Sequence, residues 1–305
     1  MAANTFRNAT AYASRAIGVL AREIVLTRAV TRDFDVNFGG ASGATVNARI
    51  GALLSASDFG DVNAEHADSG GSVTRSAVSE RYVAVTLNKM PYSAVPITTE
   101  DQSLQVDDFA ARVLLPQSRA VAERIEGYVA TALGAATYET GYEIDLSTAE
   151  PWDSIVDARA LLNEANCPRG DRFLVVGSEA ESVILKDPDL KKVDSSGTED
   201  AFREAIIGRL AGFTVLGSNA LEADEAYALH KSAFILATRA PVGPIGGAVS
   251  ASAEYGGVAA TWAADWNGVQ LQNESIVWSL AGTAPVYDGS SGTKMIRAVK
   301  LTVGS

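Results

Sequence analysis

The segment EDQSLQVDDFAARVLLPQSRAVAERIEGYVATALGAA, residues 100–136, decides the fold. One apolar stripe recurs in it at four-residue steps, formed by Val121, Ile125, Val129 and Leu133. That spacing is typical of one face of an amphipathic helix. Proline is tolerated in the first turn of a helix and disfavoured in its interior, so we expect a short helix over residues 104–114 and a second that begins at Pro116. About 18 residues with a rise of ~1.5 Å each would make a rod of ~27 Å, and the segment offers no side chains placed for chemistry.

Composition bounds the class of protein. The chain has 305 residues, of which 47% are hydrophobic and 20% are charged. This is an ordinary globular balance that can bury a substantial core. The 37 acidic residues outnumber the 25 basic ones, and the formal net charge is −12. Because phosphates repel an acidic chain at long range, the charge disfavours nucleic-acid binding over a broad face and leaves room for a local basic patch.

The sequence carries no signal for secretion or membrane insertion. Its one cysteine, Cys167, cannot form an intrachain disulfide. The first apolar run, residues 16–21, is short, and the charged residues Arg22 and Glu23 follow it directly, unlike the pattern of a secretory signal. No stretch of about 18 apolar residues occurs. We therefore expect a protein that is made and used without secretion and that has no contact with a membrane.

The first third of the chain predicts a separate helix and a long hairpin. Residues 9–31 have helical periodicity, and the glycine-rich break at 33–44 follows them. Residues 44–50 and 81–90 alternate apolar and polar side chains, with about thirty small and polar residues between them, which is typical of two strands joined by a long tip. Since an isolated two-stranded ribbon is marginal in water, we expect this one to find its partner surface elsewhere, for instance on another subunit. The alternative is a mobile surface loop.

Residues 151–240 predict a compact α/β or α+β unit. PWDSIVDARALLNEAN has the pattern of a helix that begins at Pro151. RFLVVG, residues 172–177, is a short continuous apolar run that suits a strand buried on both faces. Ser178 and Glu181 then match the Ser-x-x-Glu capping box, in which each side chain satisfies a free amide of the first helical turn.

The remainder of the chain predicts further strands. AFREAIIGRL, residues 201–210, is expected to be helical, while GFTVLG and YALHKSAFILAT are expected to be strands. In the tail, Asn267-Gly268 lies between two apolar runs and predicts a β-hairpin. Three of the four tryptophans fall in this tail, at spacings that favour core packing over stacking on bases or sugars.

No constellation of nucleophile, base and orienting group is evident. The two histidines, His66 and His230, lie far apart, and no zinc, P-loop, dinucleotide-binding or nucleophile-elbow motif occurs. Cys167 follows an expected helix, whereas a catalytic thiolate prefers a helix start or a strong cationic neighbour. Arg169, two residues later, gives that interpretation weak support. We therefore assign no catalytic residue.

The acidic residues offer no cation site either. Two Asp-x-Asp pairs occur, at positions 33 and 35 and at positions 187 and 189. Neither has the spacing of a calcium-binding loop, so we interpret all four as solvated loop residues. We assign no metal and no cofactor, and we expect a protein built to contact copies of itself.

Two stretches carry a family resemblance, CPRGDRFLVVGSEA at 167–180 and IGRLAGFTVLGSN at 207–219. Together with the order of the other elements along nearly the whole chain, they resemble the major capsid proteins of tailed bacteriophages, which share the Hong Kong 97-type fold with encapsulin shells. The resemblance implies an α+β subunit in which residues 100–136 supply the spine helix. It divides the chain into an N-arm (1–43), an E-loop β-hairpin (44–95), a P domain with the spine helix (96–145), an A domain (146–245) and a return to the P-domain β-sheet with the C-terminus (246–305).

The function that the resemblance implies is that of a major capsid (coat) protein, not an enzyme. Its copies would self-assemble into hexamers and pentamers of an icosahedral head that encloses phage dsDNA without sequence specificity. The implied partners are other copies of the chain, a portal protein and a possible decoration protein. No extra domain of about a hundred residues precedes the N-arm, so we expect a separate scaffolding protein. The implied location is the virion shell, assembled in the host cytoplasm.

Six residues are candidates for contacts between subunits. Leu53, Leu54 and Phe59 are candidate apolar anchors, and Arg75, Arg81 and Lys89 are candidates to face acids on the next subunit. Exposed ion pairs of this kind contribute under about 1 kcal/mol each and mainly fix register. Some members of the family join subunits through a lysine–asparagine bond, but no asparagine or catalytic glutamate can be matched to Lys89, and no crosslink is predicted.

Two other functions stay open from the sequence. The first is an encapsulin-type nanocompartment, which has the same fold and encloses an enzyme instead of DNA. The second is an unrelated α+β enzyme with an unrecognised site, which would reopen Cys167 and His230 as candidates. Neighbouring genes separate a phage shell from a nanocompartment, and a small discrete oligomer would mark the enzyme.

Overall fold

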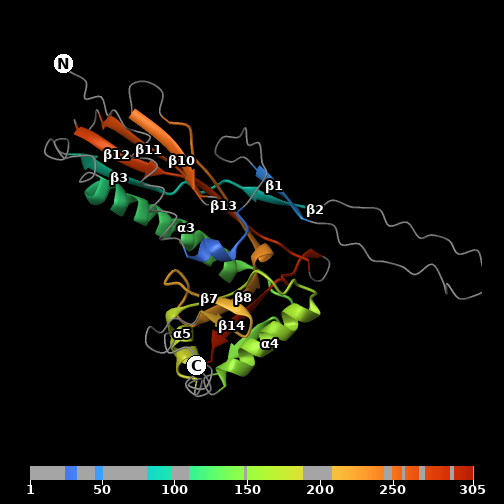
Figure 1. The fold of residues 1–305 in the computed structure, drawn as a ribbon. Coiled ribbons are helices and arrows are strands. Elements are labelled where there is room, and N and C mark those ends of the chain that lie inside the picture. Colours follow the sequence, from blue (N-terminus) through green and yellow to red (C-terminus); the bar gives the residue numbers. More distant parts are fainter. Residues whose placement is uncertain are drawn as a thin grey trace, which may run out of the picture.

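The computed structural model describes residues 25–32, 45–50, 81–97, 110–147, 150–187, 208–243, 249–255, 258–267, 272–288 and 292–304. Figure 1 shows two units along an elongated body, one built on a long helix and a sheet, the other on a second sheet with two helices. Among the described residues, no helix is both long enough and apolar enough to cross a membrane.

The long helix α3 (Leu115–Ala135) confirms the predicted rod. Its buried stripe includes Val121, Ile125, Val129 and Leu133. The predicted helix start at Pro116 is confirmed to within one residue, since Pro116 is the second residue of α3. The predicted gap before it is absent, because a π-helical turn, η3 (Ala110–Leu114), directly precedes α3. Residues 104–109 lie outside the described residues.

Helix α3 packs against a four-stranded antiparallel sheet with the order β10-β11-β12-β3. The strands are β3 (Tyr92–Ile97), β10 (Val249–Tyr255), β11 (Val258–Asn267) and β12 (Gln272–Trp278). The hairpin predicted around Asn267 is confirmed, because β11 and β12 pair with Asn267 opposite Gln272. Trp262 on β11 is fully buried, as its spacing predicts.

The second unit is a six-stranded mixed sheet with the order β4-β14-β8-β5-β7-β6. The strands are β4 (Glu143–Leu146), β5 (Arg172–Val176), β6 (Arg209–Leu210), β7 (Phe213–Gly217), β8 (Glu225–His230) and β14 (Ala298–Val303). Helices α4 (Pro151–Glu164) and α5 (Ser178–Leu185) pack against this sheet. The predicted burial of β5 is confirmed.

The C-terminal strand departs from the expected course of residues 246–305. Strands β10 to β12 pair with β3 in the sheet under α3, but β14 lies inside the six-stranded sheet, between β4 and β8. Ala298, Val299 and Leu301 are buried, so side chains from both faces of β14 are covered. Such burial suits a central strand, and β14 therefore belongs with β5 and β8.

The end of the helix expected over residues 201–210 is a strand in the structure. Residues 201–207 lie outside the described residues, and Arg209–Leu210 form strand β6. Ala211 and Gly212 follow with φ values of +47° and +88°. Two successive positive φ values are what a two-residue type I′ hairpin turn requires. The chain therefore turns straight back from β6 into β7.

The predicted capping box at the start of α5 is also wrong. Gly177 occupies the N-cap position, and Ser178 is the first helical residue, so its hydroxyl is one position too late to cap. The carbonyl of Ala223 instead accepts the N–H groups of Glu179 and Ala180, at 2.8 and 3.1 Å. A side chain at position 177 would not fit, because its Cβ would lie 2.1 Å from the carbonyl oxygen of Glu222.

Two short ladders complete the described sheets, and β1 and β2 extend to one side of the body in Figure 1. β1 (Thr45–Ile50) and β2 (Arg81–Thr86) form the predicted antiparallel ribbon, and β9 (Phe234–Arg239) pairs with β13 (Leu280–Pro285). One face of the ribbon packs on the second ladder in a small cluster made of Ala48, Val85, Leu87, Ile235, Ala237, Ala284 and Val286. YALHKSAFILAT is therefore not one strand, since η5 (Lys231–Ala233) separates β8 from β9.

Residues 25–32 are the described part of the segment that includes the expected N-terminal helix, and they are not α-helical. A 3-10 turn, η1 (Leu26–Ala29), is followed by an extended residue, Thr31. The N–H of Thr31 donates to Phe234 and its carbonyl accepts from Leu236, both at 3.0 Å. Pairing with β9 prevents a helical continuation. Leu26, Ala29 and Val30 are buried in the main core.

Candidate functional site

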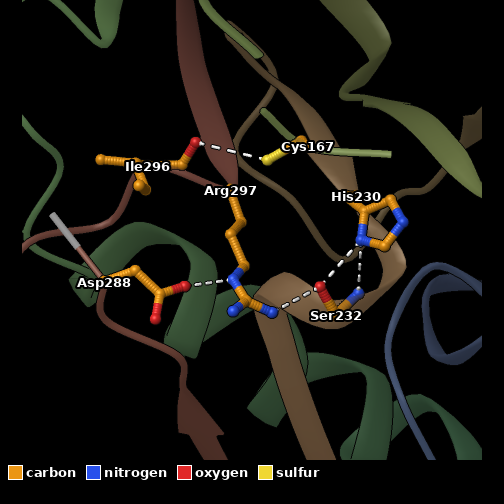
Figure 2. A network of polar contacts seen from close by, with 6 residues as sticks. All are labelled: Cys167, His230, Ser232, Asp288, Ile296 and Arg297. Atoms are coloured by element: carbon orange, nitrogen blue, oxygen red, sulfur yellow. Dashed lines mark hydrogen bonds and ion pairs between the residues drawn. The ribbon is translucent and has the colours of Figure 1, made fainter. Parts of the chain in front are cut away.

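A network of polar side chains lies where β8, η5 and the start of β14 meet (Figure 2). The Oγ of Ser232 lies 2.8 Å from Nδ1 of His230, and the backbone N–H of Ser232 donates to the same nitrogen at 3.2 Å. Nη1 of Arg297 donates to Ser232 Oγ at 2.8 Å, and Nε of Arg297 forms an ion pair with the carboxylate of Asp288. Cys167 lies beside this network, so both residues that an enzyme would use are in one place.

His230 has a structural role in this network. Its Nδ1 accepts from the N–H of Ser232, and this bond caps the 3-10 turn η5. Burial lowers the pKa of His230, and the positive charge of Arg297 lowers it further. The carboxylate of the network, Asp288, binds Arg297 and does not orient the imidazole. The arrangement therefore keeps a neutral histidine in place to hold a turn, and differs from a triad in which a carboxylate orients the base.

Cys167 is a poor nucleophile in this setting. The residue is 9% exposed, and its S–H points to the carbonyl oxygen of Ile296 at 3.9 Å. Burial raises the pKa of the thiol, although Arg297 and Arg172 act in the opposite direction. Arg172 is committed elsewhere, since its guanidinium donates to the backbone carbonyls of Cys167 and Pro168 at 2.6 and 2.8 Å. Since the thiolate is the reactive form, the geometry supports a structural cysteine.

Metal-binding groups do not converge in the part of the chain that the structure describes, where no three His, Cys, Asp or Glu side chains could hold an ion. One acidic residue differs from its expected role. Asp187 is 4% exposed, and its carboxylate accepts the N–H of Trp152 at 3.2 Å, in the first turn of α4. A carboxylate at a helix N-terminus is favourable, so Asp187 is a buried helix cap. Asp189 lies outside the described residues.

A second polar network is buried between α3 and the four-stranded sheet. The side-chain amide of Gln117 donates to the carbonyls of Ser93 and Ser275 at 3.1 and 2.7 Å. Its Oε1 accepts the hydroxyl of Ser275 at 2.8 Å, and Nε1 of Trp262 donates to the same hydroxyl at 2.9 Å. Buried polar groups are stabilising when their bonds are made and specify one arrangement of the elements. The network thus sets where the spine helix lies on the sheet.

The base of the ribbon passes very close to β13. A Cβ built on Gly282 would lie 2.3 Å from the carbonyl oxygen of Thr86. The next turn of the chain brings Lys89 alongside Ala281, with Lys89 N–H donating at 3.1 Å and its carbonyl accepting at 2.8 Å. Glycine at 282 is therefore required for β2 and β13 to approach, and Lys89 holds the base of the ribbon through its backbone.

The structure does not bring the six candidate contact residues together. Leu53, Leu54, Phe59 and Arg75 lie outside the described residues. Arg81 begins β2, opposite Ile50, at the end of the described ribbon. Lys89 is exposed at the other end of the segment.

Three exposed side chains near the ribbon were not singled out by the sequence patterns. Tyr82, Met90 and Tyr92 are 54%, 56% and 70% exposed. Tyr82 occupies the outward face of β2, whose inward residues Val83 and Val85 face the core. The signal that could have identified it is the alternation itself, since an aromatic residue at the polar positions of a half-buried strand is unusual. Exposed apolar side chains mark an interaction surface where they form a contiguous patch, whereas single ones are common on any protein.

Comparison with known proteins identifies the group to which this architecture belongs. A family model described as phage capsid protein matches residues 92–285, well over half of the chain. This chain belongs to the phage capsid protein family. The match spans β3, the spine helix, the network around Gln117 and the ladder of β9 with β13, whereas Asp288 and Arg297 lie beyond it. A comparison with curated protein sequences gave no match.

Solved structures show the fold of this capsid protein directly. A protein of Mycobacterium phage Che8 matches with a TM-score of 0.60 and 18% identity, over 91% of this chain and 90% of that one. The capsid of Ralstonia phage GP4 matches with a TM-score of 0.58 and 10% identity, over 91% and 87%. The capsid of cyanophage P-SCSP1u matches with a TM-score of 0.56 and 13% identity, over 87% and 85%. The capsid protein has the Hong Kong 97-type α+β fold that the sequence resemblance implies.

Proposed function

We propose that this chain is the major capsid protein of a tailed bacteriophage, whose copies assemble into hexamers and pentamers of an icosahedral head around dsDNA. The observation that carries the proposal is the match of the phage capsid model to residues 92–285. The likeness to the capsid of Ralstonia phage GP4 over most of both chains supports it. The buried thiol and the neutral histidine of Figure 2 support a structural role without enzymatic activity.

The ribbon provides physical support for contacts between copies. Its inward face is buried on β9 and β13, but its outward face carries the exposed Tyr82. Met90 and Tyr92, which follow the ribbon in the chain, are also exposed. Burial of such side chains in a contact contributes about 25 cal/mol for each Å² of apolar area removed from water. A neighbouring subunit that covers them would gain stability from the same residues in every copy.

The six candidate contact residues belong to this proposal. Residues 51–80 join the described ends of the ribbon, and among them Leu53, Leu54 and Phe59 are the apolar anchors that we propose for a neighbouring subunit. Arg75, Arg81 and Lys89 would set the register of that contact through exposed ion pairs. Substituting all three anchors with serine should slow or abolish assembly while the subunit keeps its fold. Unchanged assembly would remove these residues from the interface.

The further partners follow from the same proposed function. A separate scaffolding protein, a portal protein and a possible decoration protein would act on copies of this chain, in the virion shell and during assembly in the host cytoplasm. The DNA would be enclosed without sequence specificity. The net charge of −12 supports enclosure rather than tight binding, because phosphates and an acidic protein repel each other at long range.

Sedimentation velocity tests the proposed function. The chain is produced alone and together with the products of its neighbouring genes, and the particles are treated with nuclease before their contents are extracted. Fast-sedimenting closed particles with nuclease-protected DNA are the expected result for the complete set. Particles filled with a protein cargo would instead indicate a nanocompartment shell. A small discrete oligomer under every condition would contradict a shell function.

A further inference from the structure

The edge strands of the two large sheets differ in how well they are protected from pairing with another chain. Unpaired N–H and C=O groups along an edge strand can pair with another chain, and proteins limit this with short strands, charges or proline. The six-stranded sheet ends in β6, which is two residues long, and in β4, a four-residue strand with exposed Glu143 and Asp145. The four-stranded sheet ends on one side in β3, which contains Pro96. Proline has no N–H to offer a further strand.

Strand β10 is the other end of the four-stranded sheet and is less protected. Its seven residues contain no proline and only one charged residue, Glu254. The whole strand pairs with β11 on one side, from Val249 to Tyr255. Apart from this ladder, no backbone hydrogen bond joins β10 to any residue in the described ranges. Within the described ranges, the other side of β10 therefore has no backbone partner.

Residues 241–243, the last described residues before β10, lie over a face of the sheet. The hydroxyl of Thr261, on β11, donates to the carbonyl of Pro241 at 2.6 Å. The same hydroxyl lies 2.9 Å from Oγ of Ser252 on β10. A Cβ on Gly243 would meet the Oγ of Ser250. These contacts place residues 241–243 above the side chains of β10 and β11, since the alternating side chains of a strand point to the faces of a sheet.

We propose that β10 pairs antiparallel with β10 of a second copy of this chain, across a two-fold axis that passes through Ser252. The inference rests on the proposed function, which supplies neighbouring copies. A two-fold contact uses the same surface on both partners. It would join two four-stranded sheets into one continuous sheet, and every backbone group along the shared edge would gain a partner.

The sequence of β10 suits this register. Pairing about Ser252 places Ser250 opposite Glu254 of the second copy and Val249 opposite Tyr255 of the second copy. A β-branched residue opposite an aromatic one is a favourable cross-strand pair. A hydroxyl can donate to a carboxylate. An axis through Glu254 would instead place two carboxylates directly opposite each other, which is unfavourable. Charge therefore selects the axis at Ser252 over the one at Glu254.

Disulfide trapping tests the pairing in the full-length chain. Directly opposed residues of antiparallel strands have Cα atoms ~4.5–5.5 Å apart, within the ~4.4–6.8 Å that a disulfide spans. Ser252→Cys would face its own copy across the axis. Ser250→Cys is the matched control on the same strand, because its nearest equivalent would lie four residues away, at ~13 Å. The native Cys167 is buried and is present in both variants.

Assembled particles of each variant are mildly oxidised and analysed on non-reducing gels. We expect a covalent dimer in most subunits of Ser252→Cys and at least tenfold less in Ser250→Cys. If Ser252→Cys fails to fold, the double variant Ser250→Cys with Glu254→Cys tests the same register, because each new cysteine would then face the other. Particles that form normally without a crosslink in either design would overturn the pairing and leave the shell function intact. Equal crosslinking of Ser252→Cys and Ser250→Cys would overturn the register.

Failure of the β10 pairing can be distinguished from failure of the proposed shell function. If wild-type protein forms no shells, the same crosslinks are measured on the oligomer that it does form. A dimer trapped through position 252 in that oligomer supports the pairing of β10 without a shell. Absence of the crosslink there overturns the pairing as well.

Discussion

Oε1 of Glu126, in the middle of the spine helix, lies 2.8 Å from the backbone nitrogen of Leu26, one hundred residues earlier in the chain. The same oxygen accepts the N–H of Val25. The turn η1 has no side-chain cap of its own, so Glu126 supplies one from another element. Because residues after η1 pair with β9, this carboxylate joins the spine helix to the segment that continues into the second ladder.

Glu126→Ala is expected to destabilise the subunit by about 2–4 kcal/mol, because buried N–H groups left without an acceptor cost about 1–3 kcal/mol each. The measurement is urea unfolding of the unassembled subunit. Glu123→Ala is the matched control one turn away, since the side chain of Glu123 is 71% exposed, and it should change stability by less than about 0.5 kcal/mol. Equal losses in the two variants would contradict the capping role.

The contribution of Glu126 to stability should decrease as pH rises, because the side chain is buried. Desolvation raises the pKa of Glu126, and the bonds from Leu26 and Val25 only partly offset it. The folded state therefore holds this proton at pH values where the unfolded chain has lost it. The contribution is fully present below the unfolded pKa and is lost as pH rises through the folded pKa.

The free energy of unfolding of wild type minus that of Glu126→Gln should accordingly fall as pH rises from the ordinary glutamate pKa, about 4.3, through the higher folded pKa. Glutamine keeps an acceptor oxygen but does not titrate, so it isolates the effect of the proton. Urea unfolding of both proteins across this range is the measurement. If this difference in unfolding free energy stays constant or grows with pH, the hydrogen bonds to η1 affect the pKa of Glu126 more than burial does.

The network around Gln117 predicts strong coupling between the helix and the sheet. Gln117→Met keeps the approximate shape but leaves the hydroxyl and carbonyl of Ser275 without their partner, so we expect a loss of about 2–4 kcal/mol. Ser275→Ala should cost a similar amount because Trp262 Nε1 loses its acceptor. The double variant should cost less than the sum of the two single variants. Strict additivity in a double-mutant cycle of unfolding free energies would refute a coupled network.

Gly282 should be intolerant of the smallest side chain. In Gly282→Ala the new Cβ would stand 2.3 Å from the carbonyl oxygen of Thr86, and the backbone must move to relieve the overlap. We expect a loss of about 1–3 kcal/mol and a displaced ribbon base. Gly127→Ala is the control, because nothing lies within 4 Å of its Cβ and alanine favours a helix interior by up to about 1 kcal/mol. Thermal unfolding of the two variants should shift in opposite directions.

Cys167 should react slowly in the folded protein. Burial raises the pKa of its thiol, so at about pH 8 less thiolate is present than in the unfolded chain. A chromogenic disulfide reagent should label the native protein at least a hundredfold more slowly than the same protein in denaturant, and Cys167→Ser should assemble like wild type. Rapid labelling of the native thiol would reopen an enzymatic role for Cys167 and His230.

Periodic patterns in the sequence identified the main elements because each depends on local spacing. The stripe from Val121 to Leu133 predicted the spine helix, the alternation around Val85 predicted the ribbon, and Asn267-Gly268 predicted the hairpin. The start of α5 and the state of Arg209–Leu210 were mispredicted, because a distant carbonyl in one case and pairing with β7 in the other overrode local propensity.

The contacts that hold these elements together could not be predicted in the same way. Glu126 and Leu26, or Gln117 and Ser275, are separated by 100 and 158 residues, and their types and spacing in the sequence do not pair them. The placement of β14 beside β8 likewise depends on tertiary packing. Buried glutamate and glutamine within an apolar stripe were the available signal, since such residues are seldom buried without partners.

Single-particle electron microscopy of the purified full-length protein tests the central claim most directly. The account predicts closed shells, or curved sheets of hexamers and pentamers, in which subunits with the fold of Figure 1 contact several copies of themselves. Monomers or a small closed oligomer in all conditions, including with the products of the neighbouring genes, would contradict the assignment of this chain as a shell subunit.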